Sequence, residues 1–171
     1  MLGLTLGRVA ASEVGENAPN CNLSGFLNDS NIEIESYQGD VLYVDFWASW
    51  CPPCAKSFPF LNGLDQEFAP QGLRVLGVNL DEKPEDAREF LRNYPADFDV
   101  LADRSGSCAV KFAVRGMPSS YLIDRKGVIR HIHLGFRAAD ADPLKTMVQS
   151  LLAEDPSEQV AANRPALAFN P

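Results

Sequence analysis

The sequence has few cysteines, few basic residues and no long apolar stretch, and each shortage argues against a class of protein. Four cysteines in 171 residues are too few for a disulfide scaffold. No stretch approaches the roughly 18 to 20 apolar residues of a membrane-spanning helix. The 15 basic and 23 acidic residues give a net charge of −8 without a basic cluster, which argues against nucleic acid and anionic lipid as partners.

The composition that remains is typical of one globular domain. The hydrophobic set makes up 46% of the chain, and 12 glycines with 12 prolines are too few for a collagen-like or wholly disordered chain. We divide the chain into an N-terminal segment 1–17, a folded domain 18–153 and a flexible tail 154–171. The first segment lacks a basic start. It is either the remnant of an export signal, because an apolar stretch runs into small residues, or a disordered terminus.

The order of apolar patterns predicts an α/β fold. The nearly continuous apolar run Val41–Trp47 predicts a central strand covered on both faces, in which Asp45 is an anomaly. Apolar residues at helical spacing predict a helix that ends at Phe68 and is kinked by Pro59. Strands that alternate with helices indicate a mixed sheet with helices on both faces. The other expected elements are a hairpin over 23–34, strands at 73–80, 98–101, 120–123 and 128–134, and helices over 84–93, 108–114 and 144–152.

The pattern Cys51-Pro52-Pro53-Cys54 follows the central strand and begins the helix after it. A sulfur at a helix start lies beside unpaired backbone amides and the positive end of the helix dipole, which stabilise a thiolate. Cys51 is therefore placed to attack a disulfide, and Cys54, one turn later, to attack the resulting mixed disulfide. The spacing predicts a two-electron redox switch.

Other interpretations of the cysteines and histidines stay open on the sequence alone. A Cys-x-x-Cys pair is also half of a zinc site, but no second pair follows it. Cys21 and Cys108 are isolated, and they form either a structural disulfide or two buried free thiols. His131 and His133 project from one face of a strand, which raises the alternative of copper binding.

The segment 44–54, Val-Asp-Phe-Trp-Ala-Ser-Trp-Cys-Pro-Pro-Cys, resembles the active-site segment of the thioredoxin superfamily. Gly116-Met117-Pro118 resembles the cis-proline loop of that superfamily, and a Tyr-Leu-Ile-Asp strand follows it. From about residue 18 to 152 the organisation is similar to the TlpA/ResA/DsbE-like branch. The resemblance implies a thioredoxin-like three-layer fold with an N-terminal β-hairpin and an inserted helix near 84–93.

The same resemblance implies a role for individual residues. Cys51 would be the attacking thiol, Cys54 the buried resolving thiol, and Asp45 the buried acid that takes the proton of Cys54. Burial in an apolar strand should raise the pKa of Asp45. The residues implied to contact the substrate are Trp50, Pro52, Pro53, Met117 and Pro118, with a cis bond before Pro118 and a backbone contact from Met117.

Two residues and one loop depart from the pattern of the superfamily. Ser57 stands where some members of the branch have an active-site glutamate, so proton transfer would fall to Asp45. Gly77 stands where thioredoxin has a lysine beside the buried acid, so Asp45 is expected to be protonated near neutral pH. The loop 114–120 lacks the acidic sequence of the members dedicated to cytochrome c maturation.

The resemblance implies a thiol:disulfide oxidoreductase that needs no cofactor and no metal. It would exchange disulfides with exported proteins, more readily as a reductant, with apocytochrome c as one target. It would act as a periplasmic or otherwise extracytoplasmic monomer, exported or membrane-tethered in its full-length form, and receive electrons from a membrane donor of the thiol-transfer type. The alternatives are an extracytoplasmic copper- or zinc-handling protein and a redox-inert chaperone on the same fold.

Overall fold

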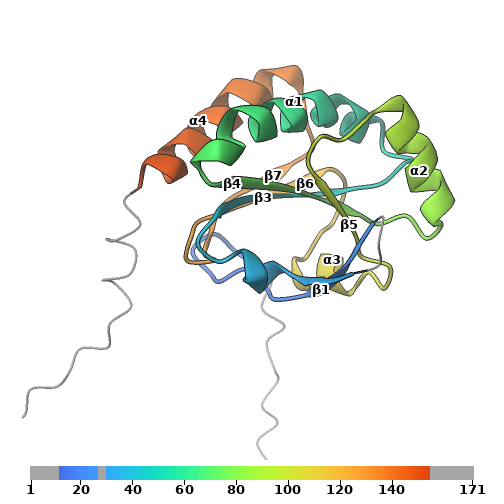
Figure 1. The fold of residues 1–171 in the computed structure, drawn as a ribbon, viewed down its shortest axis with the longest axis horizontal. Coiled ribbons are helices and arrows are strands. Elements are labelled where there is room, and N and C mark those ends of the chain that lie inside the picture. Colours follow the sequence, from blue (N-terminus) through green and yellow to red (C-terminus); the bar gives the residue numbers. More distant parts are fainter. Residues whose placement is uncertain (1–11, 27–29, 155–171) are drawn as a thin grey trace, which may run out of the picture.

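The computed structural model describes residues 12–26 and 30–154 as a three-layer α/β domain around a seven-stranded sheet (Figure 1). The strand order is β2-β1-β5-β4-β3-β6-β7. The strands are β1 (Asn22–Gly25), β2 (Asn31–Glu33), β3 (Val41–Trp47), β4 (Leu73–Asn79), β5 (Asp99–Ala102), β6 (Ser119–Ile123) and β7 (Ile129–Leu134). The helices are α1 (Pro52–Phe68), α2 (Pro84–Asn93), α3 (Ser107–Lys111) and α4 (Ala141–Ala153), with short 3-10 helices at Ile34–Tyr37, Ala69–Gln71 and Ala138–Asp140.

The sheet is mixed, as the sequence predicts. Strands β3, β4 and β5 are parallel, whereas β6 and β7 extend the sheet in antiparallel order to one edge. The predicted N-terminal hairpin is present as β1 and β2, and β1 also pairs with β5. Figure 1 shows α1, α2 and α4 on one face of the sheet and α3 on the other, so the prediction of helices on both faces is confirmed.

Strand β3 is the centre of the core, because all seven of its residues are buried. Its side chains alternate between the two faces. Tyr43 and Trp47 pack in the cluster with α1, α2 and α4, and Val44 and Phe46 pack in the cluster with α3. Asp45 has the same parity as Tyr43 and Trp47. Its carboxyl group therefore lies on the face of the sheet that α1 covers.

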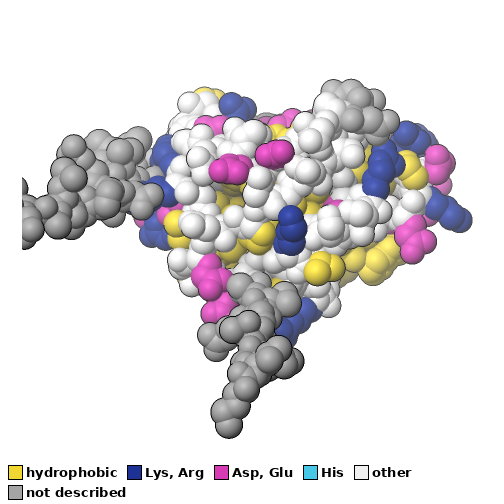
Figure 2. All heavy atoms as spheres, turned by 90° about the horizontal axis from the view of Figure 1, so that it is seen from below, with side chains coloured by type: hydrophobic (Ala, Val, Ile, Leu, Met, Phe, Trp, Pro, Cys, Tyr) yellow, Lys and Arg dark blue, Asp and Glu magenta, His cyan; other side chains and the backbone are white. Residues whose placement is uncertain are grey.

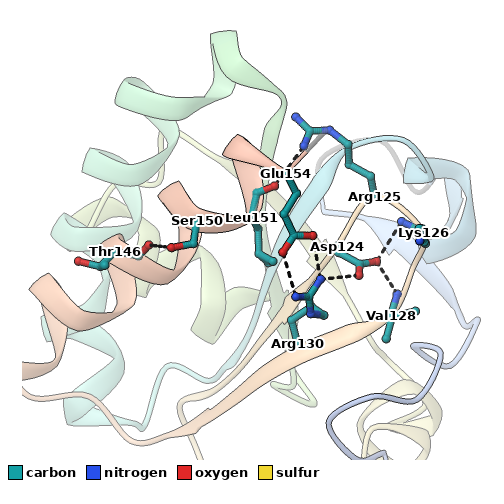
Figure 3. Close-up of polar contacts among 9 residues, drawn as sticks. All are labelled: Asp124, Arg125, Lys126, Val128, Arg130, Thr146, Ser150, Leu151 and Glu154. Atoms are coloured by element: carbon teal, nitrogen blue, oxygen red, sulfur yellow. Dashed lines mark hydrogen bonds and ion pairs between the residues drawn. The ribbon is translucent and has the colours of Figure 1, made fainter. Parts of the chain in front are cut away.

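The β6–β7 hairpin is tied to the end of α4 by a polar network (Figure 3). The buried Asp124 accepts hydrogen bonds from the amides of Lys126 and Val128 and from Arg130. Arg130 also makes a two-pronged ion pair with Glu154, at 2.9 Å for each contact. Arg125 donates to the last carbonyls of α4, at Leu151 and Leu152. These contacts hold α4 across the sheet at the end opposite to the Cys51 loop.

A disulfide between Cys21 and Cys108 joins the start of β1 to α3, which decides between the two states that the sequence left open. Nearby, the backbone before β1 is bonded to the sheet edge, because Gly15 donates to Ile129 and Ala18 to Gly127. The predicted domain limits at 18 and 153 remain predictions. Most of the segment 1–17 and nearly all of the tail 154–171 lie outside the described residues.

The element boundaries differ from the predictions in small ways. The short helix expected over 108–114 is the five-residue α3, which ends before Phe112, and Ala113 beyond it has a φ of 56°. Figure 2 shows the face that carries α3 and β1, where Lys and Arg side chains are interspersed with Asp and Glu. On this face the charge pattern agrees with the absence of a basic cluster in the sequence.

Candidate active site

Cys51 and Cys54 form a disulfide at the start of α1. Cys51 is the N-cap residue, and its Sγ accepts a hydrogen bond from the Cys54 amide at 3.2 Å. Because Pro52 and Pro53 carry no amide hydrogen, Cys54 is the first residue of the helix whose N–H can reach that sulfur. The 17-residue helix also directs the positive end of its dipole at Cys51. Both effects favour a negative charge on the Cys51 sulfur.

The two cysteines and the tryptophans beside them differ in exposure. Cys51 is 4% exposed and Cys54 is fully buried, whereas Trp50 is 69% exposed. Trp47 is fully buried, and its ring packs against Phe58 and Phe90. Trp47 is therefore a core residue, and Trp50 lies on the surface directly before Cys51.

The loop before Cys51 is held by the end of β4. The amide and the hydroxyl of Ser49 both donate to the Asp81 carboxylate, at 3.0 and 2.9 Å. Asn79 donates to the same carboxylate at 2.7 Å, and the Leu80 amide donates to the carbonyl of Trp47. Asp81 thus bonds the segment that carries Trp50 and Cys51 to the core of the sheet.

The predicted cis bond between Met117 and Pro118 is present. Ser119, the next residue, pairs with Phe46 near the end of β3, so the loop lies at the same end of the sheet as Cys51. Met117 packs against the core cluster that contains both cysteines. The Gly135 amide donates to the Pro118 carbonyl at 2.8 Å, which anchors the loop to the end of β7.

Asp45 is 1% exposed, and burial raises its pKa to about 7. Its Oδ1 accepts a hydrogen bond from the Ser120 hydroxyl at 2.6 Å, which lowers the pKa in part. Its buried Oδ2 has no hydrogen-bond partner among the described residues. The sequence prediction of a raised pKa is confirmed, and the carboxyl group has one oxygen available to take a proton.

Gly77 is the partner of Asp45 across the parallel β3–β4 pair. A Cβ built on Gly77 would lie 2.7 Å from Cε2 of Phe98. The ring of Phe98 therefore occupies the space that a lysine would need at this position. An aromatic ring in place of a cation leaves burial as the dominant influence on the pKa of Asp45.

Ser57 is buried in α1, and its hydroxyl donates to the backbone carbonyl of Cys54 at 3.0 Å. The hydroxyl is thus engaged within the helix. A serine is also a far weaker base than the carboxylate it replaces in the resemblance. The proton-accepting role that the glutamate has in the resemblance therefore does not fall to Ser57, and the candidate for it is the buried Asp45.

The two histidines of β7 lie at the edge of the sheet. Their rings stack with centroids 6.2 Å apart, and Nε2 of His133 lies 3.3 Å from the carboxylate of Asp140. Within residues 12–26 and 30–154, no three His, Cys, Asp or Glu side chains gather in a way that could hold a metal ion. The same part of the chain has no helix long and apolar enough to cross a membrane.

Two residues of the site were not predicted from the sequence. Ser120 is 75 positions from Asp45, and only the register of β3 with β6 brings the two together. Asp81 follows β4 and resembles any other acid in a loop. For Ser120 the alternation of the strand after Pro118 offered a signal, because it places Ser120 on the same face as Leu122.

The mixed sheet, the Cys51–Cys54 disulfide at the start of α1 and the cis bond before Pro118 together define a thioredoxin-like oxidoreductase. Comparison with known proteins supports this class. A family model described as Redoxin matches residues 13–149. The thiol-disulfide oxidoreductase ResA of Bacillus subtilis (strain 168) is 30% identical over 129 residues, which cover 75% of this chain and 71% of that protein. ResA of Bacillus thuringiensis subsp. konkukian is 30% identical over 117 residues, which cover 68% and 67% of the two proteins.

A solved structure gives the same result. A Chlorobium tepidum protein assigned as thiol:disulfide interchange protein DsbE is 39% identical, with a TM-score of 0.80 over 84% of this chain and all of that one. The chain belongs to the Redoxin family, within the thioredoxin superfamily. It is a thiol-disulfide oxidoreductase of the ResA/DsbE type.

Proposed function

We propose that this oxidoreductase reduces disulfides in exported proteins, with Cys51 as the attacking thiol and Cys54 as the resolving thiol. The observation that carries the proposal is the Cys51–Cys54 disulfide at the N-terminus of α1, with Cys54 fully buried. The helix start and the Cys54 amide stabilise a thiolate on Cys51. A buried Cys54 meets a substrate only after Cys51 has bonded to it.

The reaction proceeds in two displacements. In the reduced enzyme the Cys51 thiolate attacks one sulfur of the substrate disulfide, a mixed disulfide forms, and the other substrate sulfur leaves as a thiolate that takes a proton from water. Cys54 then gives its proton to Asp45 and attacks Sγ of Cys51. The Cys51–Cys54 bond forms, the second substrate thiolate leaves, and two electrons have passed to the substrate.

The substrate segment is proposed to lie along the cis-proline loop. Met117 would present its backbone there, and the carbonyl of the next residue, Pro118, already accepts a hydrogen bond from the Gly135 amide. The exposed ring of Trp50, directly before Cys51 in the chain, offers further apolar surface. Pro52 and Pro53, which begin the helix, complete the surface that the substrate contacts.

The cellular setting is part of the same proposal. The Cys21–Cys108 disulfide, which has no place in the reaction, fits an oxidising compartment outside the cytoplasm. There the enzyme would act as a monomer, and a membrane donor of the thiol-transfer type would return it to the dithiol form. The cysteine pair of apocytochrome c is the first substrate to test.

Trapping of the mixed disulfide tests the assignment of the two thiols. Cys54→Ser should retain a covalent adduct with a disulfide-bonded apocytochrome c peptide, because the resolving thiol is absent. Cys51→Ser should form no adduct, and the wild-type enzyme should release the reduced peptide. Mass spectrometry of the non-reduced products distinguishes these outcomes. An adduct in Cys51→Ser but not in Cys54→Ser would reverse the roles and contradict the proposal.

A further inference from the structure

We propose that Ser120 is a positioning residue for the redox reaction, which holds Asp45 with Oδ2 free to receive the proton of Cys54. This inference rests on the proposed function, because it assumes that Asp45 takes that proton. It concerns a residue on β6 that lies outside both the Cys-x-x-Cys segment and the cis-proline bond. Its evidence is the geometry of one row of side chains across the sheet.

The row is set by strand register. Ser120 on β6 is directly opposite Asp45 on β3, and on the other side of Asp45 the partner on β4 is Gly77. Residues opposite each other in a sheet project to the same face. Ser120 and Asp45 therefore meet on the face that α1 covers, where Cys54 is also buried.

The contact between Ser120 and Asp45 leaves the two carboxyl oxygens unequal. Oδ1 accepts the Ser120 hydroxyl at 2.6 Å, and Oδ2 is buried without a hydrogen-bond partner in the described part of the chain. A proton that reaches this carboxyl group therefore binds at Oδ2, while Oδ1 remains an acceptor. Ser120 keeps its bond in both protonation states, so the group does not have to reorient during the reaction.

The same hydrogen bond adjusts the basicity of the group. Burial raises the pKa of Asp45, and the Ser120 hydroxyl opposes this, because it stabilises the charged form more than the neutral one. Gly77 supplies no cation to do so, since Phe98 fills the space beside it. Without Ser120, a smaller fraction of the carboxyl groups would be ionised at neutral pH and able to accept a proton.

Other polar groups on this face do not replace Ser120. The groups concerned are Tyr43 on β3, His133 on β7 beyond Ser120, Asp140 beyond His133, and the two cysteines at the start of α1. Burial and Asp45 both raise the pKa of Tyr43, so this phenol stays neutral and carries no charge toward the carboxyl group. His133 is turned toward Asp140, with Nε2 at 3.3 Å from the carboxylate.

Direct titration of Asp45 tests the inference without reference to activity. The probe is the carboxyl carbon signal in NMR spectra of the oxidised protein labelled at aspartate. In Ser120→Ala we expect the midpoint of Asp45 to rise by about one pH unit, the size expected for a hydrogen bond to a charged group. Ser120→Thr keeps the hydroxyl and should titrate as wild type. Ser57→Ala, which removes an equally buried hydroxyl, should also leave the midpoint unchanged.

The kinetic test follows the resolving step alone. A small chromophoric thiol is attached to Cys51, and its release on attack by Cys54 is recorded against pH. A rise of one unit from a midpoint near 7 reduces the ionised fraction of Asp45 about fivefold at pH 7 and by less than about twofold at pH 9. Ser120→Ala should show this pH-dependent loss, and Ser120→Thr should not.

The variant Asp45→Asn separates the two proposals. If it keeps the wild-type pH profile, Asp45 is not the base, and the proposed proton transfer fails whatever Ser120 does. If Asp45→Asn abolishes the pH dependence of the resolving step, but Asp45 titrates in Ser120→Ala with the wild-type midpoint, only the role of Ser120 is overturned. A loss in Ser120→Ala that is equal at pH 7 and pH 9 likewise overturns it, because it indicates a structural effect.

Discussion

Phe98 lies so close to Gly77 that a Cβ at position 77 would approach its Cε2 to 2.7 Å. Gly77 sits in the middle of β4, where it pairs with Asp45 on one side and Val100 on the other. The absence of a side chain lets an aromatic ring cover the strand next to the buried acid. The ring thus occupies the space that a cationic side chain at position 77 would need.

Gly77→Ala should therefore destabilise the protein, because the new methyl group forces the Phe98 ring to move. We expect a loss of about 1 to 3 kcal/mol, the usual cost of overpacking a core. Gly63→Ala is the matched control, since Gly63 is in helix α1 with no atom within 4 Å of an added Cβ. That change should stabilise the protein by roughly 0.5 to 1 kcal/mol. Unfolding in urea measures the stability of both variants. Equal changes in Gly77→Ala and Gly63→Ala would contradict the close approach of Phe98 to position 77.

Asp81→Ala should loosen the loop that carries Trp50 and Cys51. Ser49 would lose the acceptor of its amide and of its hydroxyl, and the stability should fall by about 1 to 3 kcal/mol. The amide of Ser49 should exchange with solvent faster than in wild type. Hydrogen exchange followed by NMR checks this, with the exposed neighbour Glu82→Ala as the control. Unchanged protection of the Ser49 amide would show that Asp81 does not hold the loop.

The stability of the oxidised protein should decrease as the pH rises from about 4 to about 7. Burial raises the pKa of Asp45 from 3.8 to about 7, so the folded state keeps a proton that the unfolded state has released in this range. Above this pH range, the free energy of unfolding is lower by about 4 kcal/mol, which follows from a pKa raised by about 3. Asp45→Asn cannot ionise and should be the more stable protein at pH 8, with little difference at pH 3.

Unfolding of wild type, Asp45→Asn and Glu82→Gln across this pH range provides the measurement. Glu82 is exposed, so its neutral variant should leave the pH dependence as it is. If Asp45→Asn and wild type lose stability in parallel between pH 4 and pH 7, the carboxyl group is not buried as described.

Replacement of Cys21 and Cys108 by alanine should reduce stability without changing the redox reaction. The disulfide closes a loop with a sequence separation of 87, for which the chain-entropy model gives about 4.6 kcal/mol. It packs in the cluster on the α3 face, away from Cys51 and Cys54. The resolving step should therefore keep its wild-type rate below the new melting temperature. An unchanged unfolding midpoint would contradict a structural role.

The sequence predicts the parts of the site that are local and misses those that depend on register. Cys51 and Cys54 are recognisable because a redox pair must stand one helical turn apart after a buried strand. The bond between Asp45 and Ser120 joins two strands distant in sequence, and a shift of one residue in either strand would break it. The role of Asp81 becomes visible only in the structure, where its carboxylate accepts hydrogen bonds from Ser49. The pairing of the two remaining cysteines likewise needed their positions in the fold.

The equilibrium reduction potential of the Cys51–Cys54 pair shows directly whether the enzyme is a reductant. The protein is equilibrated with glutathione buffers at pH 7 and alkylated, and peptide masses report this pair separately from Cys21–Cys108. We expect a potential near or below about −220 mV, in the range of reductants, and the same value after Cys21 and Cys108 are replaced. A potential near about −120 mV, as in a strong oxidant, or a pair that forms no disulfide at any buffer composition, would contradict the proposed role as a reductant.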